Sequence, residues 1–140
     1  MGLTIECKRG NLSYDLRTGG YASLRMKVAS LSSKEWGKHY SKLMRPPFCH
    51  KEMFYESFNR VTEDLIKKRK VSSSIVDFCL QSDCGGKATY RQCREIYKHI
   101  KDHDDDASYG FVGQPDCFTF NDFKALLECC IENKCGFEWY

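Results

Sequence analysis

The sequence predicts an α+β fold, with about four helices packed on a small antiparallel sheet formed by an N-terminal hairpin and the C-terminal strand. Alternating or β-branched segments at both ends of the chain indicate strands, and apolar residues recur with helical spacing between them. The chain has 140 residues, the length of one domain, so residues 1–140 are expected to form a single domain. Nine Phe, eight Tyr and two Trp supply a core of that size.

The sheet is predicted at the two chain ends. Residues 3–7 and 12–16 alternate between apolar and polar side chains, and the glycine-bearing turn at residues 8–11 is typical of a hairpin. Residues 137–140 form a short terminal strand that can pair with this hairpin. The apolar run at residues 75–80 suits a buried strand or a buried helical turn equally well.

Helices are predicted over four long stretches, with a shorter helix at residues 33–44. Their apolar residues recur at spacings of three and four: Tyr21, Leu24, Val28 and Leu31; Phe54, Phe58, Val61 and Leu65; Cys93, Ile96, Tyr97 and Ile100; Phe123, Leu126, Leu127, Cys130 and Ile131. The second helix should run from about residue 51 to 68, and Gly136 should end the last one. Residues 103–115 form a polar, acidic loop, the segment expected to be most mobile. We expect these side chains in the core: Val61, Ile96, Phe123 and Leu127.

Two glycine-bearing segments ahead of predicted helices form the candidate ligand site. The first holds Gly19, Gly20, Tyr21 and Arg25; the second holds Ser82, Asp83, Cys84, Gly85, Gly86 and Lys87, followed by a capping box at Thr89 and Gln92. Helix starts of this kind expose backbone N–H groups that favour anions. Arg25 shares a helix face with Tyr21, so the pair could hold a phosphate and a base. Two alternatives stay open: the glycines only make turns, and Arg25 is a solvated or ion-paired surface residue.

Composition limits the compartment and the class of partner. The net charge of +3 is too small to argue for nucleic acid, so no DNA or RNA partner is expected. No apolar run approaches the ~18 residues of a membrane span, so no membrane partner is expected. Nine cysteines without a secretion signal indicate free thiols in the cytoplasm. Five of them stand among apolar residues and are expected to be buried: Cys7, Cys79, Cys93, Cys129 and Cys130.

Metal and catalytic sites are weaker alternatives. A calcium loop starting at Asp83 fails because Arg94 occupies its twelfth position, where a glutamate is required. No CxxC pair occurs, and zinc remains an alternative only through one dispersed set: Cys84, Cys93, His99 and His103. Cys84 could pair with a histidine for nucleophilic catalysis, but no nucleophile elbow, Walker loop or zincin motif is present. We therefore expect no cofactor and no metal.

Four segments of the chain carry a family resemblance: MGLTIE, GGYASLRMKVA, LQSDCGGKATYRQC and TFNDFKALLECCIENKCGFEWY. Together they resemble a family of short uncharacterised proteins from bacteriophage and bacterial genomes, whose members begin MGL-D/T-I and carry an SDCDGEI-like loop. Here Gly85 and Lys87 stand where that loop is usually acidic, which argues against a metal or acid–base role. The resemblance implies a small intracellular protein, often phage-borne.

Three functional hypotheses follow. The first is a phage-type counter-defence protein that binds and sequesters a nucleotide immune-signalling molecule without catalysis. The second is a protein-binding inhibitor of a host factor, with these candidate surface aromatics: Trp36, Tyr40, Trp139 and Tyr140. The third is an enzyme that degrades such a nucleotide. A homo-oligomer is compatible with all three.

Overall fold

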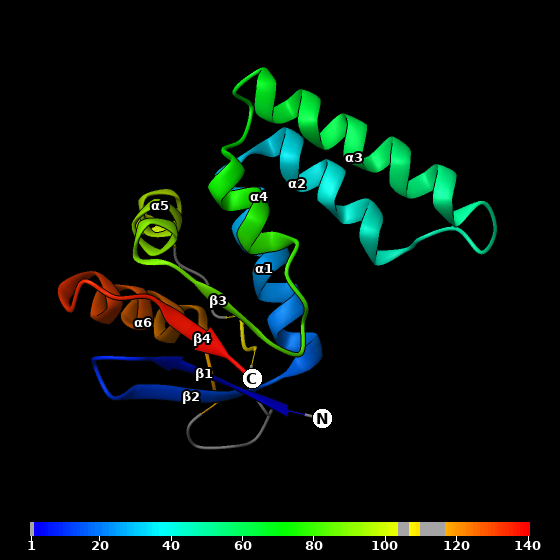
Figure 1. The fold of residues 1–140 in the computed structure, drawn as a ribbon. Helices are drawn as coiled ribbons and strands as arrows, with labels where there is room; N and C mark the ends of the chain where they lie inside the picture. The colour runs from blue at the N-terminus through cyan, green and yellow to red at the C-terminus, as the bar shows by residue number, and fades with distance from the viewer. Residues whose placement is uncertain (1, 104–106, 110–116) are drawn as a thin grey trace.

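The computed structural model describes residues 2–103, 107–109 and 117–140 and has the predicted α+β fold. These residues form six α-helices, rather than about four, on one four-stranded sheet (Figure 1). Much of the loop expected at residues 103–115 lies outside the described residues. The elements in chain order are β1 (Gly2–Cys7), β2 (Leu12–Arg17), α1 (Thr18–Ser32), α2 (Lys34–Tyr40), the 3-10 helix η1 (Ser41–Met44), α3 (Lys51–Lys67), α4 (Ser73–Cys79), β3 (Gly86–Ala88), α5 (Tyr90–Ile100), α6 (Phe120–Glu132) and β4 (Phe137–Trp139).

The sheet joins the two ends of the chain, as predicted. Its strand order is β2-β1-β4-β3, and every neighbouring pair is antiparallel. Thr4 and Tyr140 extend the pairing by exchanging two backbone hydrogen bonds of 2.8 and 3.0 Å. The edge strand β3 was not predicted, because its glycine, lysine and alanine show no strand alternation. It forms there because β4 offers a free edge.

The core lies between the sheet and the helices that cover it. Ile96, Phe123 and Leu127 are fully buried, which confirms three of the four predicted core residues. The prediction for Val61 is wrong, because this side chain is 38% exposed. Helix α3 packs on α2 and projects from the body with it (Figure 1), so only Phe58 and Thr62 of α3 are buried. We call this α2–α3 hairpin the arm.

Aromatic rings from the arm pack inward. His39 stacks on Phe58 with 4.0 Å between ring centroids, and its Nε2 lies 3.0 Å from both the Phe58 carbonyl oxygen and Thr62 Oγ1. Trp36 and Tyr40 are 0% and 4% exposed. The predicted aromatic surface is therefore wrong for these two residues and for the buried Trp139; only Tyr140 of that set is exposed.

The local signals at the helix ends are largely confirmed. Thr89 caps α5 and Thr119 caps α6, each through a reciprocal capping box. The ambiguous apolar run before residue 80 is a helix, α4. Gly136 does not end α6: Lys134 adopts a left-handed φ of 52° and closes the turn two residues earlier. Among the described residues no helix is both long and apolar enough to cross a membrane.

Candidate ligand-binding site

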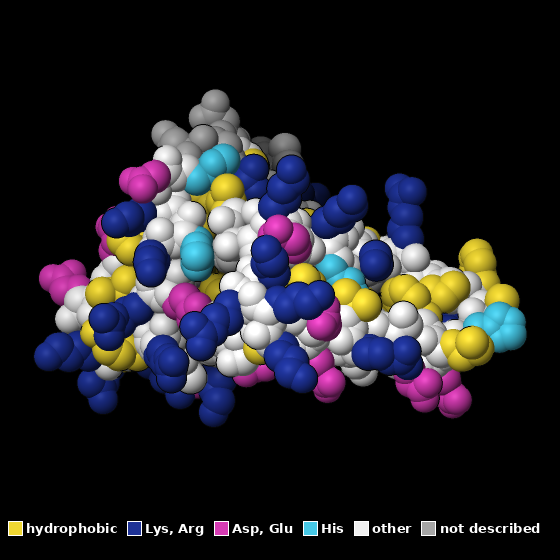
Figure 2. All heavy atoms as spheres, turned by 90° about the horizontal axis from the view of Figure 1, so that it is seen from above, with side chains coloured by type: hydrophobic (Ala, Val, Ile, Leu, Met, Phe, Trp, Pro, Cys, Tyr) yellow, Lys and Arg dark blue, Asp and Glu magenta, His cyan; other side chains and the backbone are white. Residues whose placement is uncertain are grey.

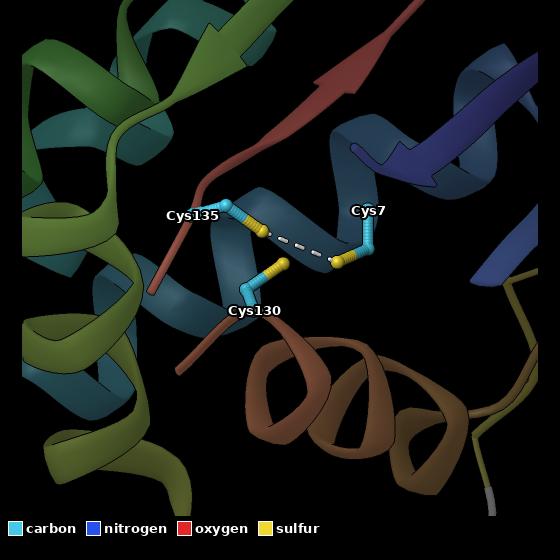
Figure 3. Close-up of side chains that lie close together, drawn as sticks. All are labelled: Cys7, Cys130 and Cys135. Carbon is cyan, nitrogen blue, oxygen red and sulfur yellow. Dashed lines mark hydrogen bonds between the residues drawn. The ribbon is translucent and has the colours of Figure 1, made fainter. Parts of the chain in front are cut away.

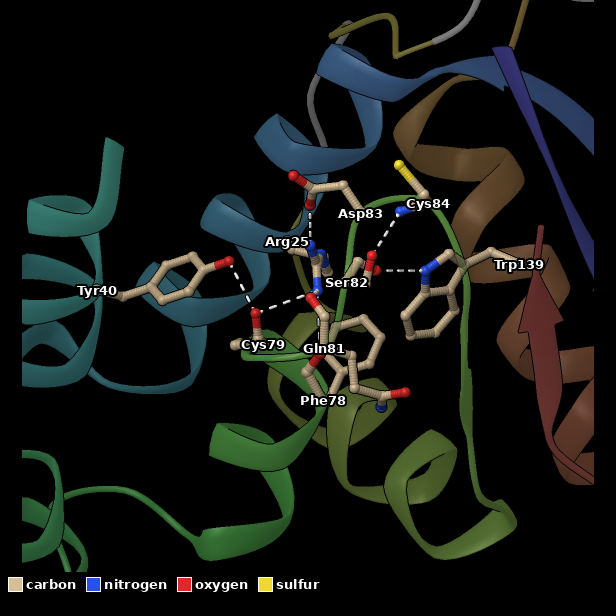
Figure 4. A network of polar contacts seen from close by, with 9 residues as sticks. All are labelled: Arg25, Tyr40, Phe78, Cys79, Gln81, Ser82, Asp83, Cys84 and Trp139. Carbon is tan, nitrogen blue, oxygen red and sulfur yellow. Dashed lines mark hydrogen bonds and ion pairs between the residues drawn. The ribbon is translucent and has the colours of Figure 1, made fainter. Parts of the chain in front are cut away.

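The structure brings the two predicted glycine-bearing segments together at one buried cation (Figure 4). Arg25, in the second turn of α1, forms an ion pair with Asp83. Its Nη1 donates to the carbonyl oxygens of Phe78, Cys79 and Gln81 at 3.4, 3.1 and 2.7 Å. The first two carbonyls belong to the last turn of α4, where a helix lacks internal donors and favours a cation. Arg25 therefore caps α4 and fixes the following loop.

Two aromatic rings enclose this guanidinium. Its carbon lies 5.2 Å from the Tyr21 ring centroid and 5.8 Å from that of Trp139. Trp139 Nε1 in turn donates to the Ser82 carbonyl oxygen at 2.9 Å. Tyr21 is 0% and Arg25 2% exposed. The predicted ligand contacts of these two side chains are not available in this arrangement, because both are already used inside the protein.

Burial also keeps the hydroxyl and thiol groups around Arg25 protonated. It raises the pKa of Tyr40 to about 12 and that of Cys79 to about 11, although the positive charge of Arg25 opposes both shifts. The pKa of Tyr21 is raised well above its usual value for the same reason. Asp83 is thus the anion that balances Arg25 here, and the network suits a structural role better than acid–base chemistry.

The predicted glycines divide into two groups. A Cβ at Gly20 would overlap the Tyr109 carbonyl oxygen, and one at Gly86 would overlap the Trp139 ring. Gly19 has open space around its Cβ position, and Gly85 meets only one distant atom. Gly20 and Gly86 therefore permit close packing between segments of the chain rather than approach to a ligand. The predicted site residues that remain at the surface are Gly19, Ser82, Cys84, Gly85 and Lys87, with Asp83 partly exposed.

A cavity of about 540 Å³ lies elsewhere, where α1 ends and the α3–α4 connection meets α5. Arg69, Lys70 and His99 supply its charged or titratable side chains, and none of its described lining residues is a carboxylate or a cysteine. The rest of its lining is small hydroxyl or aliphatic: Ser32, Ile66, Val71, Ser72, Ser73 and Ile75. We call it the basic cavity. Figure 2 shows a face of the molecule on which Lys and Arg side chains outnumber Asp and Glu.

The sequence contained only part of the signal for the basic cavity. In the sequence, the basic run at residues 67–70 is typical of a solvated helix end, and the spacing of His99 and His103 is typical of partly exposed helix residues. Neither pattern shows that α5 packs beside the α3–α4 connection, since this is a contact between distant segments. The predicted zinc set is not assembled: among the described residues, the one group placed for a metal is Cys7, Cys130 and Cys135.

Fold and cavity together define a small α+β protein with a cation-lined cavity and a projecting helical arm. A comparison with protein-family models, curated proteins and solved structures finds no match to the chain. The resemblance to short phage and bacterial proteins therefore remains an expectation, and any function is inferred from the geometry.

Proposed function

We propose that this protein binds and sequesters a small phosphate-bearing ligand of the nucleotide class in the basic cavity, without altering it. The observation that carries the proposal is the pairing of Arg69 and Lys70 in a cavity of about 540 Å³. That volume lies within the usual range for small-molecule sites. Arginine binds phosphate through two parallel N–H groups, and lysine adds a point charge.

The rest of the lining supports a nucleotide over a simple anion. Ile66, Val71 and Ile75 offer an apolar wall for a base, and His99 offers a ring beside it. The serines at the start of α4 add hydroxyl groups for a ribose or phosphate. A single imidazole without a carboxylate or thiol among the lining residues favours binding over hydrolysis, because acid–base and nucleophilic catalysis usually need a second group.

The proposal includes a cytoplasmic location and a counter-defence role. None of the nine cysteines forms a disulfide, which fits a reducing compartment. The counter-defence role depends on the family resemblance, and it makes cyclic nucleotides and cyclic ADP-ribose variants the first ligands to test.

Isothermal titration calorimetry with these nucleotides tests the proposal, followed by chromatography of the recovered ligand. We expect binding and unchanged ligand. Arg69→Gln or Lys70→Gln should weaken the affinity for the nucleotide ~10–150-fold, since a charge-assisted bond contributes ~1.5–3 kcal/mol. Lys68→Gln is the matched control: it belongs to the same basic run but pairs with Asp64 and does not line the cavity. Absence of binding, or equal weakening by the control, would contradict the proposal, and altered ligand would indicate an enzyme.

A second candidate function is protein binding through the end of the arm. Four large side chains there are exposed by 43% to 103%: Met44, Phe48, Met53 and Tyr55. This apolar end lies at the right of Figure 2. Exposed apolar clusters mark protein interfaces. Light scattering after size-exclusion chromatography tests whether the arm mediates self-association. If the wild type is a dimer, the double variant Phe48→Ser with Met53→Ser should be monomeric. A monomeric wild type would exclude self-association and leave a different protein as the partner of this surface.

A further inference from the structure

Three cysteine sulfurs converge where the two ends of the chain meet (Figure 3). Cys7 ends β1, Cys130 lies in the last turn of α6, and Cys135 precedes β4. The three Sγ atoms all lie within 4.8 Å of one another, and those of Cys7 and Cys135 are 3.5 Å apart. Cys129 brings a fourth sulfur to 3.6 Å from Cys7 Sγ.

These separations match a metal thiolate site. Zinc binds cysteine sulfur at about 2.3 Å in tetrahedral geometry, which places the sulfurs about 3.8 Å apart. A disulfide would instead need a sulfur–sulfur bond of about 2.05 Å. Cys7, Cys130 and Cys135 are at most 9% exposed, so the group is shielded from water as structural zinc sites are.

The hairpin turn after Cys7 supplies hydrogen-bond donors to the sulfurs. The backbone of Gly10 makes a hydrogen bond to Cys7, and that of Arg9 makes one to Cys135. A Cβ at Gly10 would overlap Cys129 Sγ, so the turn packs directly on the sulfurs. Hydrogen bonds that fix the orientation of the ligands are the usual support of a metal site.

We propose that Cys7, Cys130 and Cys135 bind a structural zinc ion, with Cys129 as the fourth ligand. Cys93 also borders the group, since its side chain makes a hydrogen bond to Cys130. Cys129 is the better candidate because its sulfur lies 3.6 Å from Cys7 Sγ and because the residue is partly exposed, which offers a path of entry. The ion links β1, the end of α6 and the segment before β4. It therefore links two residues that are 128 positions apart in the sequence, Cys7 and Cys135. This proposal does not depend on the basic cavity.

Zinc content of the protein, purified without a metal-binding tag, tests the proposal. We expect one zinc per chain in the wild type and loss of that zinc in Cys135→Ser and Cys130→Ser. Cys49→Ser, which changes an exposed cysteine outside the cluster, should keep it. Zinc far below one per chain in the wild type, or iron in its place, would overturn the proposal.

The cobalt(II) spectrum of the wild-type protein tests the site even if the serine variants do not fold. Wild-type protein should show the absorption of tetrahedral cobalt with four thiolates. Cys129→Ser should lower the thiolate-to-cobalt charge-transfer intensity by about a quarter, and Cys93→Ala should leave it unchanged. The opposite result would assign the fourth position to Cys93, and a spectrum without thiolate bands would exclude the site.

Discussion

Arg25 connects three parts of the chain that are distant in the sequence: α1, the end of α4 with its following loop, and β4. Its side chain is 2% exposed, and it contacts the last turn of α4, the loop after it and, through ring faces, β4. A buried cation is stable only where its charge and its N–H groups are matched. Here three carbonyl oxygens accept from Nη1 and Asp83 pairs with Nη2, whereas the buried Nε has no hydrogen-bond partner among the described residues.

Arg25→Ala should therefore lower the free energy of unfolding by ~3–5 kcal/mol, because it leaves a carboxylate and three carbonyl groups without their donor. Urea denaturation measures this change. Arg60→Ala is the control, since Arg60 is an exposed residue of α3, and it should cost under ~0.5 kcal/mol. Equal, small effects of both substitutions would show that Arg25 is not part of the folding network.

Protonation of His39 makes the free energy of unfolding depend on pH. Burial lowers its pKa below the ordinary value of 6.5, although the hydrogen bond to the Phe58 carbonyl opposes the shift. The unfolded chain then binds this proton more readily than the folded chain, so stability should fall as pH drops through 6.5 toward the lowered pKa. NMR titration of the imidazole should give a midpoint below 6.5. His39→Gln should reduce the loss of stability between about pH 7.5 and 5.5; a midpoint at or above 6.5 would refute this.

At the scale of elements, glycines set how closely α1 approaches its neighbours. Gly20, in the first turn of α1, faces the Tyr109 carbonyl oxygen, whereas the adjacent Gly19 has no atom within 4 Å of its Cβ position. Gly19 and Gly20 are the same residue type in the same turn of α1 and differ only in what surrounds them. They therefore form a matched pair.

Gly20→Ala should cost ~1–3 kcal/mol by overpacking, because either the helix or the Tyr109 segment must move. Gly19→Ala should be neutral or should stabilise by up to ~1 kcal/mol, since alanine restricts the unfolded chain and suits a helix. Thermal denaturation of both variants measures the difference. A similar effect of both would mean that the close approach to Tyr109 does not constrain α1.

At the scale of the whole molecule, the body and the arm differ in how much they bury. Helix α6 buries five of its 13 residues, whereas α3 buries two of its 17. The N-cap residue that precedes α3, His50, has a left-handed φ of 58° and makes no side-chain cap. Because tertiary packing supplies most of the stability of a helix, α3 should open more readily than α6.

Hydrogen–deuterium exchange read by mass spectrometry or NMR tests this difference. Backbone amides of α3 should exchange at least about tenfold faster than those of α6, which should open only with global unfolding. Amides of α2 provide an internal comparison, since Trp36 and His39 anchor that half of the arm in the structure. Equal protection of α3 and α6 would show that the arm folds and unfolds as one unit with the body.

The sequence by itself determined the fold class, the hairpin, most helix boundaries and the capping box at Thr89 and Gln92. These features depend on interactions between residues a few positions apart, so periodicity and cap residues report them directly. Burial of Ile96, Phe123 and Leu127 follows in the same way, because one face of an amphipathic helix must meet a core. Val61 shows the limit: it has the same spacing, but among the described elements α3 packs mainly on α2.

Only the tertiary structure decided what the chemically active residues do. Arg25 is a structural cap rather than a ligand contact because α4 ends against α1. The basic cavity exists because α5 lies beside the α3–α4 connection, and the four-cysteine cluster because the chain ends share a sheet. Each of these contacts joins segments far apart in the sequence, and local residue patterns contain no information on which distant segments meet.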